Sequence, residues 1–183
     1  QYWSAITNVV DVISAMPYPD HFGKYEYGFQ EVVWTKPYEL LNSKEQEEII
    51  DLAKKTWQFF EDYITEENNY LPPDNYQESR NTKVADRTSS TNIGLGLLSV
   101  ISAYDLKFIE LEKALILIQK MLETICKLPK WNGHLYNWYN IHNLKPLEPR
   151  YVSTVDSGNF IGYLFTLKGY LNNKIHQSDG ILR

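Results

Sequence analysis

The sequence predicts an all-α fold in which helical hairpins carry long polar and aromatic connections. Apolar residues recur at helical spacing in five separate segments, whereas strand-like alternation is confined to one short excursion near 132–149. The chain has 183 residues, of which 43% are hydrophobic and 22% charged, and these values are ordinary for a folded domain with a buried core. We therefore expect one helical domain with elaborate loops.

Composition and charge argue against several classes of function. The net charge of −5 and the pI near 5.4 argue against nucleic-acid binding, which needs a basic surface. The single cysteine, Cys126, allows no internal disulfide and indicates a reducing compartment. No metal or cofactor is expected, because the histidines lack metal-type spacing and no phosphate-binding glycine loop is present. With no apolar run near the roughly 20 residues of a membrane span and no secretory leader, we expect a soluble segment without membrane contact.

The N-terminal half contains two of the expected helices. The first covers 2–15 and ends before Pro17, and an irregular aromatic stretch follows it. The second begins at Ser43, which forms a capping-box pattern with Gln46. Its apolar stripe runs over 49–64, which is long enough for a helix that faces the core.

A long connection and a glycine-containing helix come next. No periodicity survives over 66–90, and a loop of that length inside a compact domain is usually functional or disordered. Its Pro-Pro pair and flanking aromatic residues favour an ordered, functional loop. Ser90 or Thr91 is expected to cap the next helix. Gly94 and Gly96 lie inside that helix, where glycine is costly, and this indicates close packing or close approach of a ligand.

Two further helices flank the strand-like excursion. One covers 108–128 and ends before Pro129. Its apolar residues step by three and four, as in a helix-pair seam: Phe108, Leu111, Leu115, Ile118, Leu122 and Ile125. After the excursion, the last expected helix starts near Asp156 and carries apolar residues as far as Leu171.

Three loop motifs, at 71–77, 86–94 and 150–159, hold the residue types that sugar binding needs. Short polar side chains bind hydroxyl groups, and aromatic faces contact the C–H groups of sugar rings. The second and third motifs directly precede helices, so they are expected to present their side chains at one end of a bundle. The residues expected to face a substrate are Asp74, Asn75, Arg87, Thr91, Asn92, Trp138 and Asp156.

Structural roles compete with these assignments. Asp156 can be a helix cap, Asp86 can pair with Arg87 to hold the loop, and Asp74 can be a turn residue. A glycosidase needs two carboxylates on opposite sides of one glycosidic bond. Asp74, Asp86 and Asp156 are the carboxylates within the motifs, and the sequence alone does not place any two of them in register.

Several long strings resemble the central part of bacterial cyclic β-1,2-glucan synthases in order and spacing, from about position 34 to 171. They are Thr56-Trp57-Gln58-Phe59-Phe60, 71–77, 87–95, Gly133-His134-Leu135-Tyr136-Asn137-Trp138-Tyr139, and 151–159. The resemblance implies the start of a glycoamylase-like region, whose fold is an (α/α)6 toroid with the active site at its loop-bearing face. The chain then corresponds to a single domain, 1–183, that is the N-terminal portion of the toroid.

The resemblance also implies an activity and a setting. The family region cyclises linear glucan by retaining transglycosylation, with its catalytic carboxylates expected beyond Arg183, so the isolated fragment is expected to be inactive. The parent would be a large membrane enzyme, with this segment on the cytoplasmic side of the inner membrane. Two positions depart from the family pattern. Ser90 stands where proline is expected, and Asn140 stands where aspartate is expected, which removes a charge from a sugar-facing loop.

The hypothesis is a fragment that lines one side of a β-1,2-glucan cleft, with β-1,2-glucan or a related oligosaccharide and the rest of the parent polypeptide as partners. Self-association through exposed helix faces is a further expectation. Two other classes stay open. One is a small stand-alone glycosidase that uses Asp86 and Asp156. The other is a helical scaffold that binds a partner protein without a catalytic role.

Overall fold

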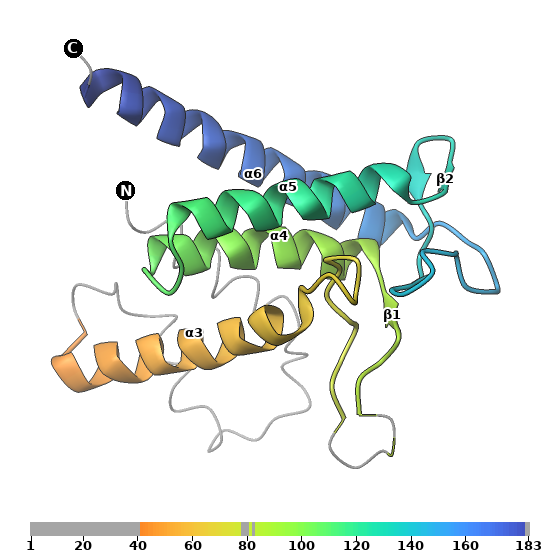
Figure 1. The fold of residues 1–183 in the computed structure, drawn as a ribbon, viewed down its shortest axis with the longest axis horizontal. Helices are drawn as coiled ribbons and strands as arrows, with labels where there is room; N and C mark the ends of the chain where they lie inside the picture. Colours follow the sequence, from red (N-terminus) through yellow and green to blue (C-terminus); the bar gives the residue numbers. More distant parts are fainter. Residues whose placement is uncertain (1–40, 78–80, 82, 182–183) are drawn as a thin grey trace. The chain divides into compact units, whose positions relative to one another are not determined.

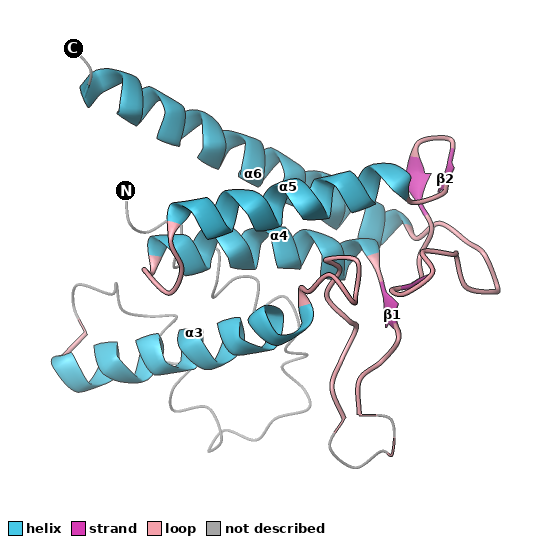
Figure 2. Cartoon of the chain, viewed as in Figure 1, coloured by secondary structure: helices cyan, strands magenta, loops and turns pink. Residues whose placement is uncertain are grey.

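The structure is a computed structural model that describes residues 41–77, 81 and 83–181. The chain divides into two compact units, Gln1–Gln58 and Phe59–Arg183. The expected helix at 2–15 lies outside the described residues. Among the described residues the structure is helical with short strands, so the predicted all-α class with a small β excursion is confirmed (Figure 2).

Helix α3 (Ser43–Tyr63) begins in the first unit and ends in the second. Its predicted start is correct, but its predicted cap is wrong by one residue. Asn42 Oδ1 accepts a hydrogen bond from the Glu45 backbone N–H (3.0 Å), and Glu45 Oε2 accepts one from the Asn42 N–H (2.9 Å). The capping box is therefore Asn42 with Glu45, and it satisfies two donors that the first turn would otherwise leave open.

In the second unit, α4 (Ser90–Asp105) packs against both α5 (Leu111–Lys127) and α6 (Thr154–Ile181) (Figure 1). Helix α4 is apolar on most sides, and Ile93, Leu97 and Val100 are fully buried. Ser89, not Ser90 or Thr91, is the N-cap: its hydroxyl accepts the backbone N–H of Asn92 (3.2 Å). The predicted cap was misplaced because three consecutive residues here can all serve as caps.

The two glycines of α4 allow close packing, as the sequence predicts. A Cβ atom on Gly94 would lie 2.2 Å from Tyr163 Cδ2 of α6. One on Gly96 would lie 2.9 Å from Met121 Cε of α5 and 3.0 Å from Pro72 Cγ. Glycine therefore lets both neighbours approach α4 at distances that any larger residue would prevent.

The predicted seam of α5 is only partly correct. Ile118 and Ile125 are buried, but Leu111 and Leu115 are each 48% exposed. The buried face instead includes Ala114 and Met121. Helix α5 is apolar on more than one side, and only one of those sides meets α4.

Two short antiparallel pairs form at one end of these helices. Strand β2 (Lys130–Trp131) pairs with β3 (His134–Leu135). Strand β1 (Arg87–Thr88) pairs with β4 (Tyr139–Asn140), with Arg87 opposite Asn140. The predicted hairpin is thus present, but its last strand pairs with a segment some 50 residues earlier in the chain. Among the described helices, none combines the length and the apolar character that crossing a membrane requires.

Candidate functional site

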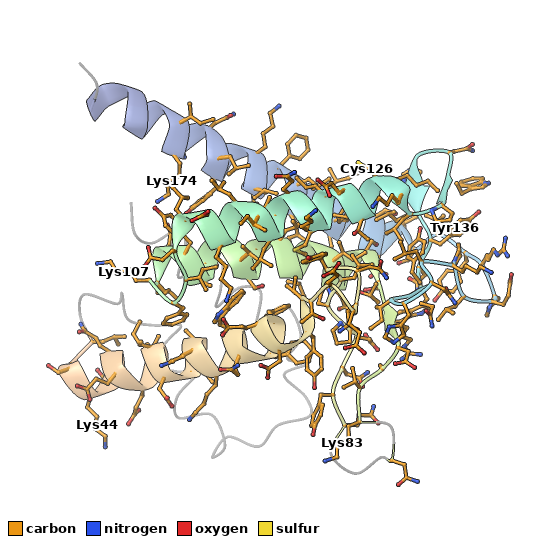
Figure 3. All side chains as sticks on the ribbon, viewed as in Figure 1. Lys44, Lys83, Lys107, Cys126, Tyr136 and Lys174 are labelled. Carbon is orange, nitrogen blue, oxygen red and sulfur yellow. The ribbon has the colours of Figure 1, made fainter. Side chains whose placement is uncertain are left out.

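The three loop motifs converge at the end of the helices where β1 and β4 lie. Asp74 donates its backbone N–H to Arg87 O (2.7 Å), which ties the first motif to the second. Thr91 in the second motif contacts Asp156 in the third through side chains. In Figure 3, Tyr136 marks this end of the second unit, and Lys107 and Lys174 mark the other.

The Asp74 carboxylate is at the centre of one part of the cluster. Its Oδ2 accepts from Arg87 Nε (3.2 Å), Arg87 Nη2 (3.0 Å) and Asn75 Nδ2 (2.9 Å). Its Oδ1 accepts from Asn92 Nδ2 (3.0 Å). Four donors therefore point at this carboxylate, which orients Arg87 and is already occupied on both oxygens.

Arg87 lies over the Trp138 ring, with the guanidinium carbon 4.4 Å from the ring centroid. Such a cation–π contact contributes about 0.5–1 kcal/mol at an exposed site. The β1–β4 pairing explains how the two residues meet, because Trp138 directly precedes β4. Arg87 covers one face of the indole, so a ligand that stacks on Trp138 has to use the opposite face.

A second network surrounds Asp156 in the first turn of α6. Thr91 Oγ1 donates to Asp156 Oδ1 (2.6 Å), and Asn159 Nδ2 approaches the same hydroxyl (3.4 Å). The helix cap is Ser153, whose hydroxyl accepts the Asp156 N–H (3.1 Å). Asp156 is thus a bridge between α4 and α6 and not the cap of its own helix.

Asn137 completes this network, and sequence analysis missed it. With its amide nitrogen donating to Asp156 Oδ2 (3.1 Å), its oxygen accepts from the Tyr151 hydroxyl (2.7 Å) and from the Trp138 indole N–H. Asn137 is buried although it is polar. The sequence did contain a signal for this residue, because Asn137 stands between aromatic residues. An amide that is buried among aromatic side chains needs hydrogen-bond partners.

Asp86 stands apart from both networks. Its side chain is 67% exposed, and its one ionic partner among the described residues is His142, with Oδ1 3.4 Å from Nε2. Its backbone oxygen accepts from the Ile141 N–H (3.1 Å). Of the eight sequence-predicted site residues, the structure brings seven into the two hydrogen-bonded clusters and leaves the Asp86 side chain outside them.

Tyr139 joins two of the loop segments through its buried side chain. It is fully buried, and its hydroxyl donates to Pro129 O (2.7 Å) and accepts from the Tyr136 N–H (2.7 Å). Burial, which disfavours the phenolate, raises the pKa of Tyr139 to about 12. Burial also raises the pKa of Tyr163, and the Asp156 carboxylate adds to this shift. Both phenols therefore stay neutral and structural at ordinary pH.

A hollow of about 340 Å³ adjoins the first cluster and shares Asn75 and Arg87 with it. It is bordered by the two arms that lead to and from the 78–82 region and by the loop after β4. Within the described residues, no three His, Cys, Asp or Glu side chains are grouped as metal ligands would be. The hollow and the first cluster therefore place polar side chains close to the Trp138 ring.

Comparison with known proteins gives two matches. A protein-family model described as "Putative glycosyl hydrolase domain" matches residues 1–80. The chain is also 48% identical over 121 residues to the cyclic beta-(1,2)-glucan synthase NdvB of Rhizobium meliloti. The resemblance to cyclic β-1,2-glucan synthases is confirmed.

The match covers 66% of this chain and 4% of the length of the Rhizobium cyclic glucan synthase. The chain thus corresponds to a small part of that relative. Both matches support a carbohydrate-active role, and this agrees with the polar and aromatic chemistry of the clustered loops.

Proposed function

We propose that this chain is a glucan-binding part of a cyclic β-1,2-glucan synthase-like transglycosylase, and that it lines one side of the glucan cleft. The proposal rests on the convergence of the loop motifs, the first two at Arg87 beside Trp138 and the second and third at Asp156. Arg87 and Asn92 bind sugar hydroxyls, and the face of Trp138 opposite Arg87 stacks on a ring. Asp74 and Asp156 hold these groups in place, since their oxygens already accept protein donors.

The proposal extends to the surroundings of the chain. Helices α4, α5 and α6 are part of an (α/α)6 toroid, and the single domain 1–183 is its N-terminal portion. Exposed apolar residues on the outer sides of α5 and α6 are where other helices of the parent polypeptide pack, and they also allow self-association of the isolated chain. They are Leu111, Leu115, Ile116, Val155, Ile161, Phe165 and Ile175. The parent acts at the cytoplasmic side of the inner membrane.

A fluorescence titration with linear β-1,2-glucan tests the binding site. The chain is expected to show a saturable change in tryptophan emission, because glucan binding alters the surroundings of Trp138. Trp138→Phe should lose most of that change and bind more weakly. Trp131→Phe is the matched control, since Trp131 is 56% exposed on β2 and belongs to neither cluster.

Two results would refute the proposal. One is the absence of any emission change with β-1,2-glucan. The other is a change that Trp138→Phe retains in full. A linear α-1,4-glucan of the same length serves as the control ligand and should give no saturable signal.

Catalysis is a separate part of the proposal. The isolated chain is expected to leave linear β-1,2-glucan unchanged, because its clustered carboxylates are occupied by protein donors. Chromatography of the glucan after long incubation measures this, and cyclic or shortened products would contradict it.

A scaffold role remains the second candidate, favoured by the exposed apolar residues of α5 and α6. It shares the expectation of self-association but predicts no response to glucan. The same titration therefore separates the two.

A further inference from the structure

The 340 Å³ hollow beside Arg87 lies between backbone segments that are hydrogen-bonded to one another. The arms on either side of it are joined by the antiparallel bridge between Tyr76 and Val84. Gln77 donates its N–H to Lys83 O (2.6 Å), and Ala85 donates to Asn75 O (3.1 Å). The third wall is the loop after β4, which β1 holds by strand pairing. The walls are thus fixed by backbone hydrogen bonds.

The lining offers several hydrogen-bonding groups that the described part of the protein does not use. The side-chain amide of Asn75 donates through Nδ2 to Asp74, and no described group bonds its side-chain oxygen Oδ1. Asn140 accepts two backbone N–H groups on its oxygen (3.0 Å each), which leaves its amide nitrogen available. The Gln77 amide has no hydrogen bond to any described residue and lines the hollow. Three amides therefore supply both donors and acceptors to one small space.

Among the described residues that line the hollow or pair with its lining, the charges balance. Arg87 is paired with Asp74 (3.0 Å), and the lining contributes one further cation, Lys83, and one further anion, Asp86. An anion-binding site would have an excess of positive charge. Amides with balanced charge suit a neutral polyhydroxylated ligand, and the volume is at the lower end of the roughly 300–1,000 Å³ found for small-molecule sites.

We propose that this hollow is an additional saccharide subsite, which binds a sugar unit of the same glucan chain next to the unit held at Arg87 and Trp138. The inference rests on the proposed function. Gln77 and Asn140 bind hydroxyl groups of that unit, and Arg87 is shared between the two positions. Longer glucans therefore bind more tightly than short ones, because only they reach both positions.

Calorimetric titration of the chain with short and long linear β-1,2-gluco-oligosaccharides tests the subsite. The long ligand is expected to bind more tightly than the short one. Gln77→Ala should weaken the long ligand by roughly threefold to tenfold, the effect of one neutral hydrogen bond, and leave the short ligand unchanged. Gln119→Ala is the matched control, because Gln119 is an exposed glutamine on α5 whose partner is Glu123. Thermal melts check that both variants are folded.

The outcomes separate the subsite from the site. If the wild-type chain binds neither oligosaccharide, the proposed function fails and the subsite fails with it. If it binds both with equal affinity, or if Gln77→Ala binds the long ligand as tightly as wild type, the subsite alone is wrong. Tight binding of inorganic phosphate that Lys83→Ala abolishes would overturn its assignment to a neutral sugar.

Discussion

Replacing Asp74 with asparagine tests whether this carboxylate holds Arg87 in place. The side chain of Asp74 is 19% exposed and accepts four hydrogen bonds from the side chains of Arg87, Asn75 and Asn92. An amide of the same shape accepts at one oxygen only, and its NH₂ group would face a donor. The variant Asp74→Asn therefore loses the ion pair and at least one hydrogen bond without leaving a cavity.

The expected cost follows from the partners and their exposure. Hydrogen bonds to charged groups contribute about 1.5–3 kcal/mol, against about 0.5–1.5 kcal/mol for neutral ones. Arg87 is 47% exposed, so solvent screens much of the difference. We expect Asp74→Asn to lower the free energy of unfolding by about 1–2 kcal/mol, whereas Asp86→Asn should change it by less than about 0.5 kcal/mol, since Asp86 is exposed and its His142 contact is long.

Urea denaturation measures the free energy of unfolding of both variants. The comparison requires that this free energy depend equally steeply on urea concentration in each variant. A second measurement separates positioning from bulk stability: tryptophan emission without glucan should shift in Asp74→Asn, because Arg87 moves from the Trp138 face. Asp86→Asn should leave that emission unchanged. Equal losses of stability in the two variants, or unaltered emission in Asp74→Asn, would show that Asp74 does not position Arg87.

Three further predictions concern packing, pH and association. Gly94→Ala should destabilise the chain by about 1–3 kcal/mol in urea because its Cβ would collide with α6, whereas Gly162→Ala, with open space around it on α6, should be neutral or stabilising; equal effects would contradict the packing. The pKa of Tyr139 is raised to about 12, so the stability that this phenol contributes is present below pH 10 and is lost as pH rises from 10 to 12. Tyr139→Phe should lower the free energy of unfolding by about 1–3 kcal/mol at pH 8 and should remove its decrease between pH 10 and 12. If the free energy of unfolding of the variant falls with pH as steeply as that of the wild type, the assignment is wrong. Phe165→Glu should reduce self-association in sedimentation experiments, because Phe165 is 69% exposed on α6, and Asn172→Glu should not; a monomeric wild-type chain would exclude the association.

Local patterns in the sequence predict most of the helices and the reason for their close approach. Capping residues, prolines and helical spacing are local signals, and they place the starts of α3 and α4 within one or two residues. Gly94 and Gly96 are informative because glycine inside a helix has a cost that close packing offsets. The errors arise where neighbouring residues are equally able to cap a helix, as Asn42 and Ser43 are at the start of α3.

The sequence predicts seven of the residues that lie in the two hydrogen-bonded clusters, but not how the clusters are arranged. Residue types indicate that Thr91 and Asp156 can bind polar groups, but only the packing of α4 on α6 brings them within 2.6 Å. The pairing of β1 with β4 joins segments about 50 residues apart, and two-residue strands have no periodicity from which to infer it. Asn137 was missed for a similar reason, since two of its three partners, Tyr151 and Asp156, lie further along the chain.

The way the carboxylates are occupied bears on what this part of the protein does. A general acid or nucleophile in glycoside chemistry needs a carboxyl oxygen that can reach the glycosidic oxygen or the anomeric carbon. Asp74 and Asp156 each have both oxygens engaged by protein donors. Asp86 lies outside the clusters beside His142, but it is exposed and lines the hollow next to Arg87. The other groups of the clusters are the Arg87 guanidinium, amide side chains and the Trp138 ring, which are groups suited to binding a sugar and not to breaking a glycosidic bond. This arrangement is consistent with the proposed glucan-binding role, in which the catalytic pair comes from outside the two clusters.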